Sequence, residues 1–232
     1  MNKIWGYNNK NQKMPKNKRL KTSNTNDDND SDNESDSSSS SKLPFFLQRS
    51  PNNYIYSHVN HIYFNNNITS STAFELNKEL RNIENKLKTI ALTLSVEVKP
   101  IYLHLTTDGG EIYSAMSVVD CIKSISIPVY TVIDGFVASA GTLISLAGKK
   151  RYIGENAYML IHELRSGFWG KMTSIDEEYS NLKKIMTHIT KIYIDNTKIT
   201  KKELEGFLKK DVIWDAKECI TKGLVVDYYK SF

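Results

Sequence analysis

From residue 44 onward, short apolar runs alternate with stretches of helical periodicity. Aromatic and polar residues alternate from Tyr54 to Phe64, which predicts one or two short strands. Ser70 or Ser71 is placed to cap a helix, because apolar residues then recur at the helical period. The apolar positions of this helix are Leu76, Leu80, Ile83 and Leu87.

The middle of the chain repeats strand and helix patterns. Residues 101–105 and 129–133 are short runs rich in β-branched and aromatic residues, which predict strands. A helix with an apolar face is expected between them, over residues 115–122. A helix of small residues is expected over 138–146, and the apolar run 157–161 follows. This order predicts successive βαβ units with parallel strands and right-handed connections.

The C-terminal part is predicted to be mainly helical. A long helix is expected over residues 174–194, and a short helix over 201–209 precedes Asp211. An apolar segment, residues 218–226, closes the domain. The long helix carries apolar residues at helical spacing, namely Ile175, Tyr179, Leu182, Ile185, Met186 and Ile189.

The N-terminal segment differs in texture from the rest of the chain. Residues 24–41 are almost wholly Asn, Asp, Ser, Glu and Thr, and such a segment cannot bury enough apolar surface to offset chain entropy. Residues 1–48 are therefore predicted to be a disordered, low-complexity extension, and residues 49–232 a single domain. The basic cluster at residues 13–21 has three interpretations: a nuclear address, an interaction tail or a solvated charge run.

Composition argues against several classes of protein. The formal charge of +5, from 31 basic and 26 acidic residues, is small for 232 residues and argues against nucleic-acid binding. Two cysteines make no disulfide scaffold, and Cys121 lies in an apolar helical pattern that predicts a buried thiol. No stretch has the ~18 apolar residues needed to span a bilayer, and no apolar segment of a secretory signal follows the first lysines. We expect a cytoplasmic protein with no membrane partner.

Three segments carry candidate chemistry. Ser139 lies among small residues where a predicted strand meets a helix, so its hydroxyl would lie near unpaired backbone N–H groups. Gly109 and Gly110 follow another predicted strand and permit close approach of a ligand. His162 ends a third predicted strand and is suited to act as a general base.

Each of these segments also has a purely structural interpretation. Small-residue helices often contain serine for close packing, paired glycines form tight turns, and a histidine at a strand end is commonly structural. Together they are more specific, because parallel sheets place ligand sites at the carboxyl ends of their strands. The three segments supply a nucleophile, a base and an oxyanion donor, and a carboxylate that orients the histidine is still required.

Residues 54–230 resemble the proteolytic subunit of the Clp protease. The markers are the paired glycines at 109–110, Ala-Ser-x-Gly at 138–141 and Met-Leu-Ile-His at 159–162. They are followed by a long helix, an Asp before an apolar stretch, Asp-Ala-Lys-Glu at 215–218 and Gly-Leu-Val at 223–225. The resemblance implies an α/β fold of the Clp protease and crotonase type, a spiral of βαβ units with a protruding strand–helix handle.

The resemblance also implies the roles of individual residues. Ser139 would be the nucleophile, His162 the general base and Asp211 the acid that orients the histidine. The backbone N–H groups of Gly109 and Ala140 would form the oxyanion hole. Three other carboxylates, those of Asp176, Asp215 and Glu163, are rivals of the third triad member but do not match its motif position.

Further expectations concern cofactors and partners. The family needs no metal and no organic cofactor. Its subunits form a heptameric ring, here expected as a single or double ring, and an AAA+ unfoldase delivers unfolded polypeptide to it. The expected function is that of an ATP-dependent serine endopeptidase working inside an oligomeric chamber.

Two of the chain's departures from the family pattern bear on its expected activity. Asp108 stands beside the paired glycines where the family has proline, and a carboxylate there opposes an oxyanion if it points inward. The segment after the histidine, residues 164–170, is also altered. Two alternatives therefore stay open: a non-catalytic ring subunit, and an enzyme of acyl-CoA substrates related to the crotonases.

Overall fold

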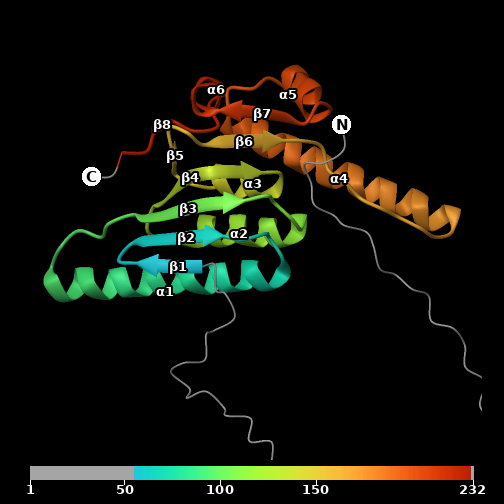
Figure 1. Ribbon diagram of the computed structural model, residues 1–232. Coiled ribbons are helices and arrows are strands. Elements are labelled where there is room, and N and C mark those ends of the chain that lie inside the picture. Colours follow the sequence, from blue (N-terminus) through green and yellow to red (C-terminus); the bar gives the residue numbers. More distant parts are fainter. Residues whose placement is uncertain (1–54, 231–232) are drawn as a thin grey trace, which may run out of the picture. The chain divides into compact units, whose positions relative to one another are not determined.

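The computed structural model of the protein describes residues 55–230, which form one α/β domain (Figure 1). The predicted extension over residues 1–48 and its boundary lie outside the described residues. The strands are β1 (Ile55–His58), β2 (His61–Asn65), β3 (Ile101–Thr107), β4 (Val129–Ala138), β5 (Lys150–Ile153), β6 (Tyr158–Ile161), β7 (Val212–Asp215) and β8 (Asp227–Tyr228). The helices are α1 (Ser70–Leu94), α2 (Ile112–Ser124), α3 (Ala140–Leu146), α4 (Met172–Asn196), α5 (Lys201–Leu208) and α6 (Ala216–Lys222).

All the described strands join in one sheet, in the order β1-β2-β3-β4-β5-β8, and β6 adds to β4 and carries β7. The pairs β2–β3, β3–β4, β4–β5, β4–β6 and β5–β8 are parallel, as the βαβ spacing predicted. The pairs β1–β2 and β6–β7 are antiparallel. The predicted α/β fold class is therefore confirmed.

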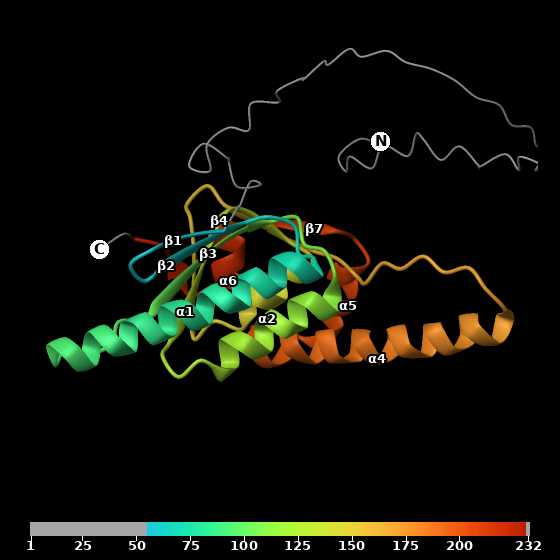
Figure 2. The ribbon, with the colours of Figure 1, turned by 90° about the horizontal axis from the view of Figure 1, so that it is seen from below.

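The helices α1, α2 and α4 lie on one face of the sheet (Figure 2). Apolar residues alternate along β3, and Leu103 and Leu105 are fully buried. The predicted apolar face of α1 is buried as well, with Leu76 and Leu80 at 0% exposure. Burial of such side chains contributes about 1.5–3 kcal/mol each, so this apolar layer is the main stabilising element of the domain.

Helix α1 begins one residue earlier than the sequence pattern predicted. Its N-cap is Thr69, not Ser70 or Ser71, and the Thr69 hydroxyl accepts the backbone N–H of Thr72 at 3.2 Å. The Thr72 hydroxyl receives the Thr69 N–H at 2.9 Å in return. This reciprocal pair satisfies two N–H groups that the helix leaves unpaired, which is why the helix begins there.

Strand β4 is longer than predicted, because Asp134 and Gly135 do not end it. The first half pairs with β5 and the second half with β6, so the strand changes neighbours in its middle. Gly135 adopts a φ of +75° at this point, and the register against β3 shifts between Leu105 and Thr107. A glycine and a bulge allow a strand to bend without breaking. As a result the following helix, α3, begins at Ala140 and not at residue 138.

The handle consists of α4 and the segment before it. The first half of α4 extends beyond the sheet (Figure 1), and Tyr179 on its predicted apolar stripe is 59% exposed. Only Ile189, Ile192 and Tyr193 of this helix are buried. Residues 162–169 form no strand within the described chain, because an isolated extended segment has no neighbour to complete a hydrogen-bonded ladder.

Candidate active site

The three predicted segments meet at one edge of the sheet. The register pairs Thr107 of β3 with Val137 of β4, and Ala138 of β4 with Leu160 of β6. The residues that follow each strand therefore lie together. Parallel strands have their carboxyl ends at one edge of the sheet. This edge is where α/β folds place their ligand sites.

Ser139 lies on the sharp turn between β4 and α3. Its backbone adopts φ 55° and ψ −127°, a combination that non-glycine residues rarely occupy. Its N–H donates to the Leu160 carbonyl oxygen at 2.9 Å, which ties the turn to β6. The side chain is half-buried and sits just before the first turn of α3. A hydroxyl presented on a strained strand-to-helix turn is the arrangement of a nucleophile in many hydrolases.

The first of the paired glycines, Gly109, presses against this turn. A Cβ placed on Gly109 would lie 2.6 Å from the Ser139 Cβ and 3.2 Å from the Ala140 nitrogen, so only glycine fits there. The N–H of Gly109 donates to the Thr107 hydroxyl at 3.0 Å. Within residues 55–230, no hydrogen bond of the Gly110 or Ala140 N–H is found. These two N–H groups thus have no partner among the described residues.

The departure at Asp108 leaves its carboxylate exposed to solvent. No ion pair or side-chain hydrogen bond of Asp108 is found in the described part of the chain. Water screens an exposed charge strongly. Asp108 therefore has a much smaller effect on an oxyanion than a buried carboxylate at the same place would have.

His162 and Asp211 adjoin the last residue pair of two neighbouring strands. Strands β6 and β7 are antiparallel, and their last pair is Ile161 opposite Val212. His162 is the residue after β6, and Asp211 is the residue before β7. Asp211 adopts a φ of +49°, so the extended strand conformation does not reach it. The ladder thus brings near each other two residues that are 49 positions apart in the chain.

These two side chains nevertheless have other partners. The Nδ1–H of His162 donates to the Glu163 carbonyl oxygen at 2.6 Å. The carboxylate of Asp211 forms an ion pair with Arg165. No hydrogen bond joins Ser139 to His162, or His162 to Asp211, within residues 55–230. The three side chains are therefore not in a hydrogen-bonded relay.

The rival carboxylates have other positions. Asp215 caps helix α6, where its side chain accepts the Glu218 N–H at 2.8 Å. Asp176 is exposed on the protruding part of α4. Glu163 is exposed as well, and it is its backbone oxygen that contacts His162. Of the four carboxylates considered, Asp211 alone adjoins the last pair of the β6–β7 ladder, next to which His162 lies.

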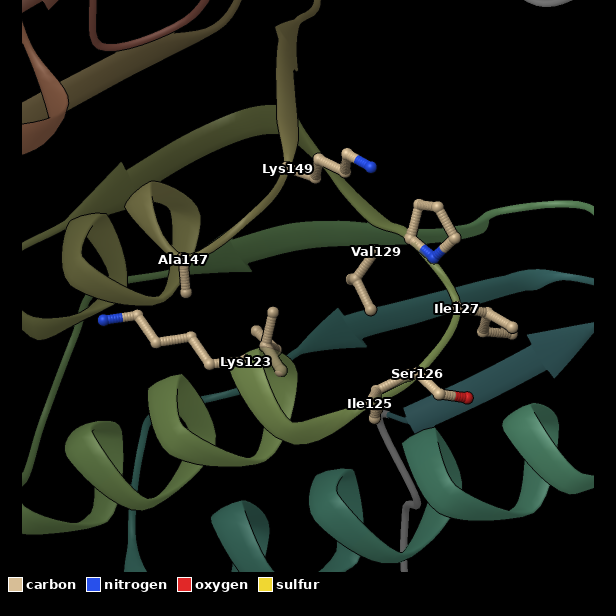
Figure 3. Close-up of a pocket in the computed structure, with 9 residues that line it drawn as sticks. Lys123, Ile125, Ser126, Ile127, Val129, Ala147 and Lys149 are labelled. Carbon is tan, nitrogen blue, oxygen red and sulfur yellow. The ribbon is translucent and has the colours of Figure 1, made fainter.

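A cavity of about 240 Å³ lies at the other end of the strands (Figure 3). It is lined by residues around the start of β4, among them Val129, Lys123 and Lys149. In Figure 3 the two lysine side chains point away from each other, so they do not converge on one ligand. The lining residues include one serine, Ser126, but no histidine and no carboxylate. This cavity therefore has no convergent set of groups that resembles a catalytic site.

Sequence reasoning missed several elements around the site. Strand β5 and helix α6 were not predicted, because their segments are short and rich in charged residues. The contact of Arg165 with Asp211 was not predicted either, since the two residues are distant in sequence. Both cysteines are buried, as expected for Cys121. No helix in the described part of the chain is long and apolar enough to cross a bilayer.

Comparison with known proteins places these features in a family. Residues 53–230 match the family model described as Clp protease. The chain is 34% identical over 162 residues to the ATP-dependent Clp protease proteolytic subunit 2 of Treponema denticola, covering 68% of this chain and 80% of that protein. For the Treponema pallidum protein of the same name, identity is 33% over 135 residues, with 57% and 67% covered. The solved structure of a ClpP1 mutant from Listeria monocytogenes shares the fold, with a TM-score of 0.61, 22% identity, and 72% and 89% of the two chains covered.

Proposed function

This chain belongs to the Clp protease family and is a peptidase, and on that premise we propose that it is a serine endopeptidase that uses Ser139, His162 and Asp211. The observation that carries the proposal is the meeting of three strand ends at Ser139. That residue has a strained backbone and a glycine pressed against it, and His162 and Asp211 adjoin the last pair of the neighbouring β6–β7 ladder. The proposed substrates are unfolded polypeptides.

The proposed reaction is acyl transfer through the Ser139 hydroxyl. The oxygen attacks the peptide carbonyl carbon while His162 takes the hydroxyl proton, and the carbonyl oxygen becomes the oxyanion. Because Nδ1 of His162 carries a proton and donates it to Glu163, Nε2 is the nitrogen left to accept the new one. The imidazolium then gives that proton to the leaving amine. Water attacks the ester in the same way and releases the acid.

The oxyanion is proposed to bind backbone N–H groups beside Ser139. Ala140 and Gly109 are the donors implied by the family resemblance. The Gly109 N–H must first leave the Thr107 hydroxyl, whereas the Gly110 N–H has no such partner. Gly110 is therefore a second candidate for this role. Removing one such donor from a protease costs roughly 10²–10³ in kcat.

The proposal extends to assembly. A ring of seven subunits, single or double, is proposed to enclose the sites, and an AAA+ unfoldase is proposed to deliver the substrate with hydrolysis of ATP. In support, the protruding part of α4 exposes large apolar side chains that nothing in the described chain covers, with Met172 at 71% and Tyr179 at 59% exposure. Exposed apolar groups of this kind mark protein contact surfaces.

Labelling with a fluorophosphonate probe tests the proposal. The full-length protein should become labelled at Ser139, and Ser139→Ala should abolish labelling. Ser145→Ala, within α3, is a matched control. The Ser145 hydroxyl is buried and has no hydrogen-bond partner in the described part of the chain. Labelling that persists in Ser139→Ala would show that the nucleophile has been assigned wrongly.

The non-catalytic ring subunit is the second candidate function. The separate partners of His162 and Asp211 favour it, because a base without its orienting carboxylate is weak. Wild-type oligomer that fails to react with any serine-directed probe would support it. The acyl-CoA alternative has no support from the family match, which is to a peptidase.

A further inference from the structure

Arg165 occupies the carboxylate that the proposed mechanism needs. Its guanidinium forms an ion pair with Asp211, and the two side chains are 60% and 48% exposed. The contact joins the segment after β6 to the residue just before β7. An arginine holds a carboxylate through directional N–H donors, so the pair fixes where the oxygens of Asp211 point as well as its charge.

His162 makes no hydrogen bond with the Asp211 carboxylate in the described part of the chain. His162 and Asp211 adjoin the last pair of the β6–β7 ladder, yet the single Nδ1–H of His162 goes to the Glu163 carbonyl oxygen at 2.6 Å. A carbonyl oxygen fixes the tautomer, but it stabilises an imidazolium less than a carboxylate does. Arg165 thus holds the carboxylate that His162 lacks, and the Glu163 carbonyl oxygen takes the place of that carboxylate.

We propose that Arg165 is a latch on the catalytic site: its ion pair with Asp211 keeps the carboxylate from His162, and breaking the pair lets the Asp211 and His162 side chains join. Arg165 acts through Asp211 and is a positioning residue. This inference rests on the proposed function, because it assigns a role relative to the proposed triad.

The segment that carries Arg165 makes few hydrogen bonds with the rest of the described chain. Its last backbone contacts are the Glu163 N–H to the Leu208 oxygen at 2.9 Å and the Leu164 N–H to the Met186 sulfur at 3.4 Å. From residue 165 to residue 170, no further hydrogen bond is found in the described chain apart from the Arg165 contact. Moving the arginine therefore breaks one ion pair and no other hydrogen bond found in the described chain.

A supporting role of Arg165 predicts the opposite effect. A carboxylate has two oxygens, and an arginine on one of them can hold the other toward a histidine. In that arrangement His162 would donate to Asp211, whereas here it donates to Glu163. The two roles therefore differ in the sign of the change that follows when Arg165 is replaced.

The test compares labelling rates of the full-length protein with a fluorophosphonate probe. Arg165→Gln should be labelled about two- to fivefold faster than wild type, the effect expected from the loss of one exposed ion pair. Arg165→Lys keeps a charge and should restore most of the wild-type rate. Lys210→Gln removes a neighbouring exposed charge without touching the pair and should leave the rate unchanged. An unchanged or slower Arg165→Gln protein overturns the latch.

One further readout separates a latch from a general structural effect. Raising NaCl from about 0.05 M to about 0.5 M screens exposed charges, so it should speed labelling of wild type and hardly affect Arg165→Gln. An equal response of the two proteins to salt overturns the latch.

Failure of the latch and failure of the proposed function are distinguishable. If wild type is labelled at Ser139 and Arg165→Gln reacts no faster, the triad stands and the latch is wrong. If neither protein is labelled, the proposed function fails and the latch fails with it. Labelling of Arg165→Gln alone, lost again on adding Ser139→Ala, supports both.

Discussion

Glu84 is a carboxylate buried inside the helical layer, and replacing it should weaken the domain in a pH-dependent way. Its side chain is 6% exposed and accepts hydrogen bonds from the Lys88 ammonium at 2.9 Å and the Arg81 guanidinium at 3.2 Å. It also accepts the N–H of Ser126 at 2.8 Å and its hydroxyl at 2.7 Å. Glu84 thereby joins α1 to the loop that leads into β4.

The magnitude follows from the pKa of this carboxyl. Burial alone opposes ionisation, but the hydrogen bonds from Lys88, Ser126 and Arg81 outweigh it and lower the pKa from 4.5 to about 2. Such a change corresponds to a ceiling of about 3 kcal/mol in the free energy of unfolding at neutral pH. Lys88 and Arg81 are themselves nearly half exposed, so salt and water reduce their share. We expect a loss of about 1–2 kcal/mol in Glu84→Gln.

The sign of the pH dependence is determined by the lowered pKa. The stabilisation is fully present above the unfolded value of 4.5 and disappears as the pH falls toward about 2, where the native carboxyl takes up its proton. Urea unfolding of wild type and Glu84→Gln at pH 7 and at several values down to about pH 3 measures this difference. The gap between the two proteins should narrow as the pH falls.

A matched control is available on the same helix. Glu75 pairs with Lys78 at 3.2 Å, but its side chain is 41% exposed. Glu75→Gln should therefore change the free energy of unfolding by less than about 0.5 kcal/mol at every pH. A gap for Glu84→Gln that stays constant between pH 7 and pH 3, or one no larger than that of Glu75→Gln, would refute the reasoning.

Three further predictions concern the site and its surroundings. Asp211→Asn should stay folded by circular dichroism yet lower the fluorophosphonate labelling rate roughly 10²–10⁴-fold, because the asparagine cannot stabilise an imidazolium; an unchanged rate would remove Asp211 from the triad. Gly110→Ala should be insoluble or melt far below wild type, because the new Cβ would lie 2.1 Å from the Ile68 oxygen. In the control Gly135→Ala the new Cβ meets no atom within 4 Å, so the only cost is the strain of a positive φ. The Cys219 thiol should resist alkylation in the native protein and react on unfolding, because burial, followed by Asp215 and Glu218, raises its pKa to about 12; rapid native labelling at neutral pH would contradict its burial.

The sequence was sufficient for features that depend on near neighbours. The apolar faces of α1 and α2 were predicted correctly because a helix repeats every 3.6 residues, and Leu76, Leu80, Val118 and Ile122 are all buried. The three strand ends were predicted to meet because parallel strands share one edge. Ser139, the paired glycines and His162 could therefore be grouped before any coordinates were known. The residue assignments at the site themselves remain predictions.

Only the tertiary structure decided which partner each of these groups has. Asp134 and Gly135 look like a turn in the sequence, yet β4 continues through them because β6 is there to pair with its second half. The pairing of Asp211 with Arg165, in place of His162, depends on two segments 46 residues apart. A local pattern records the preference of a segment for helix or strand, whereas hydrogen bonds and ion pairs between distant segments form only after the chain has brought them together.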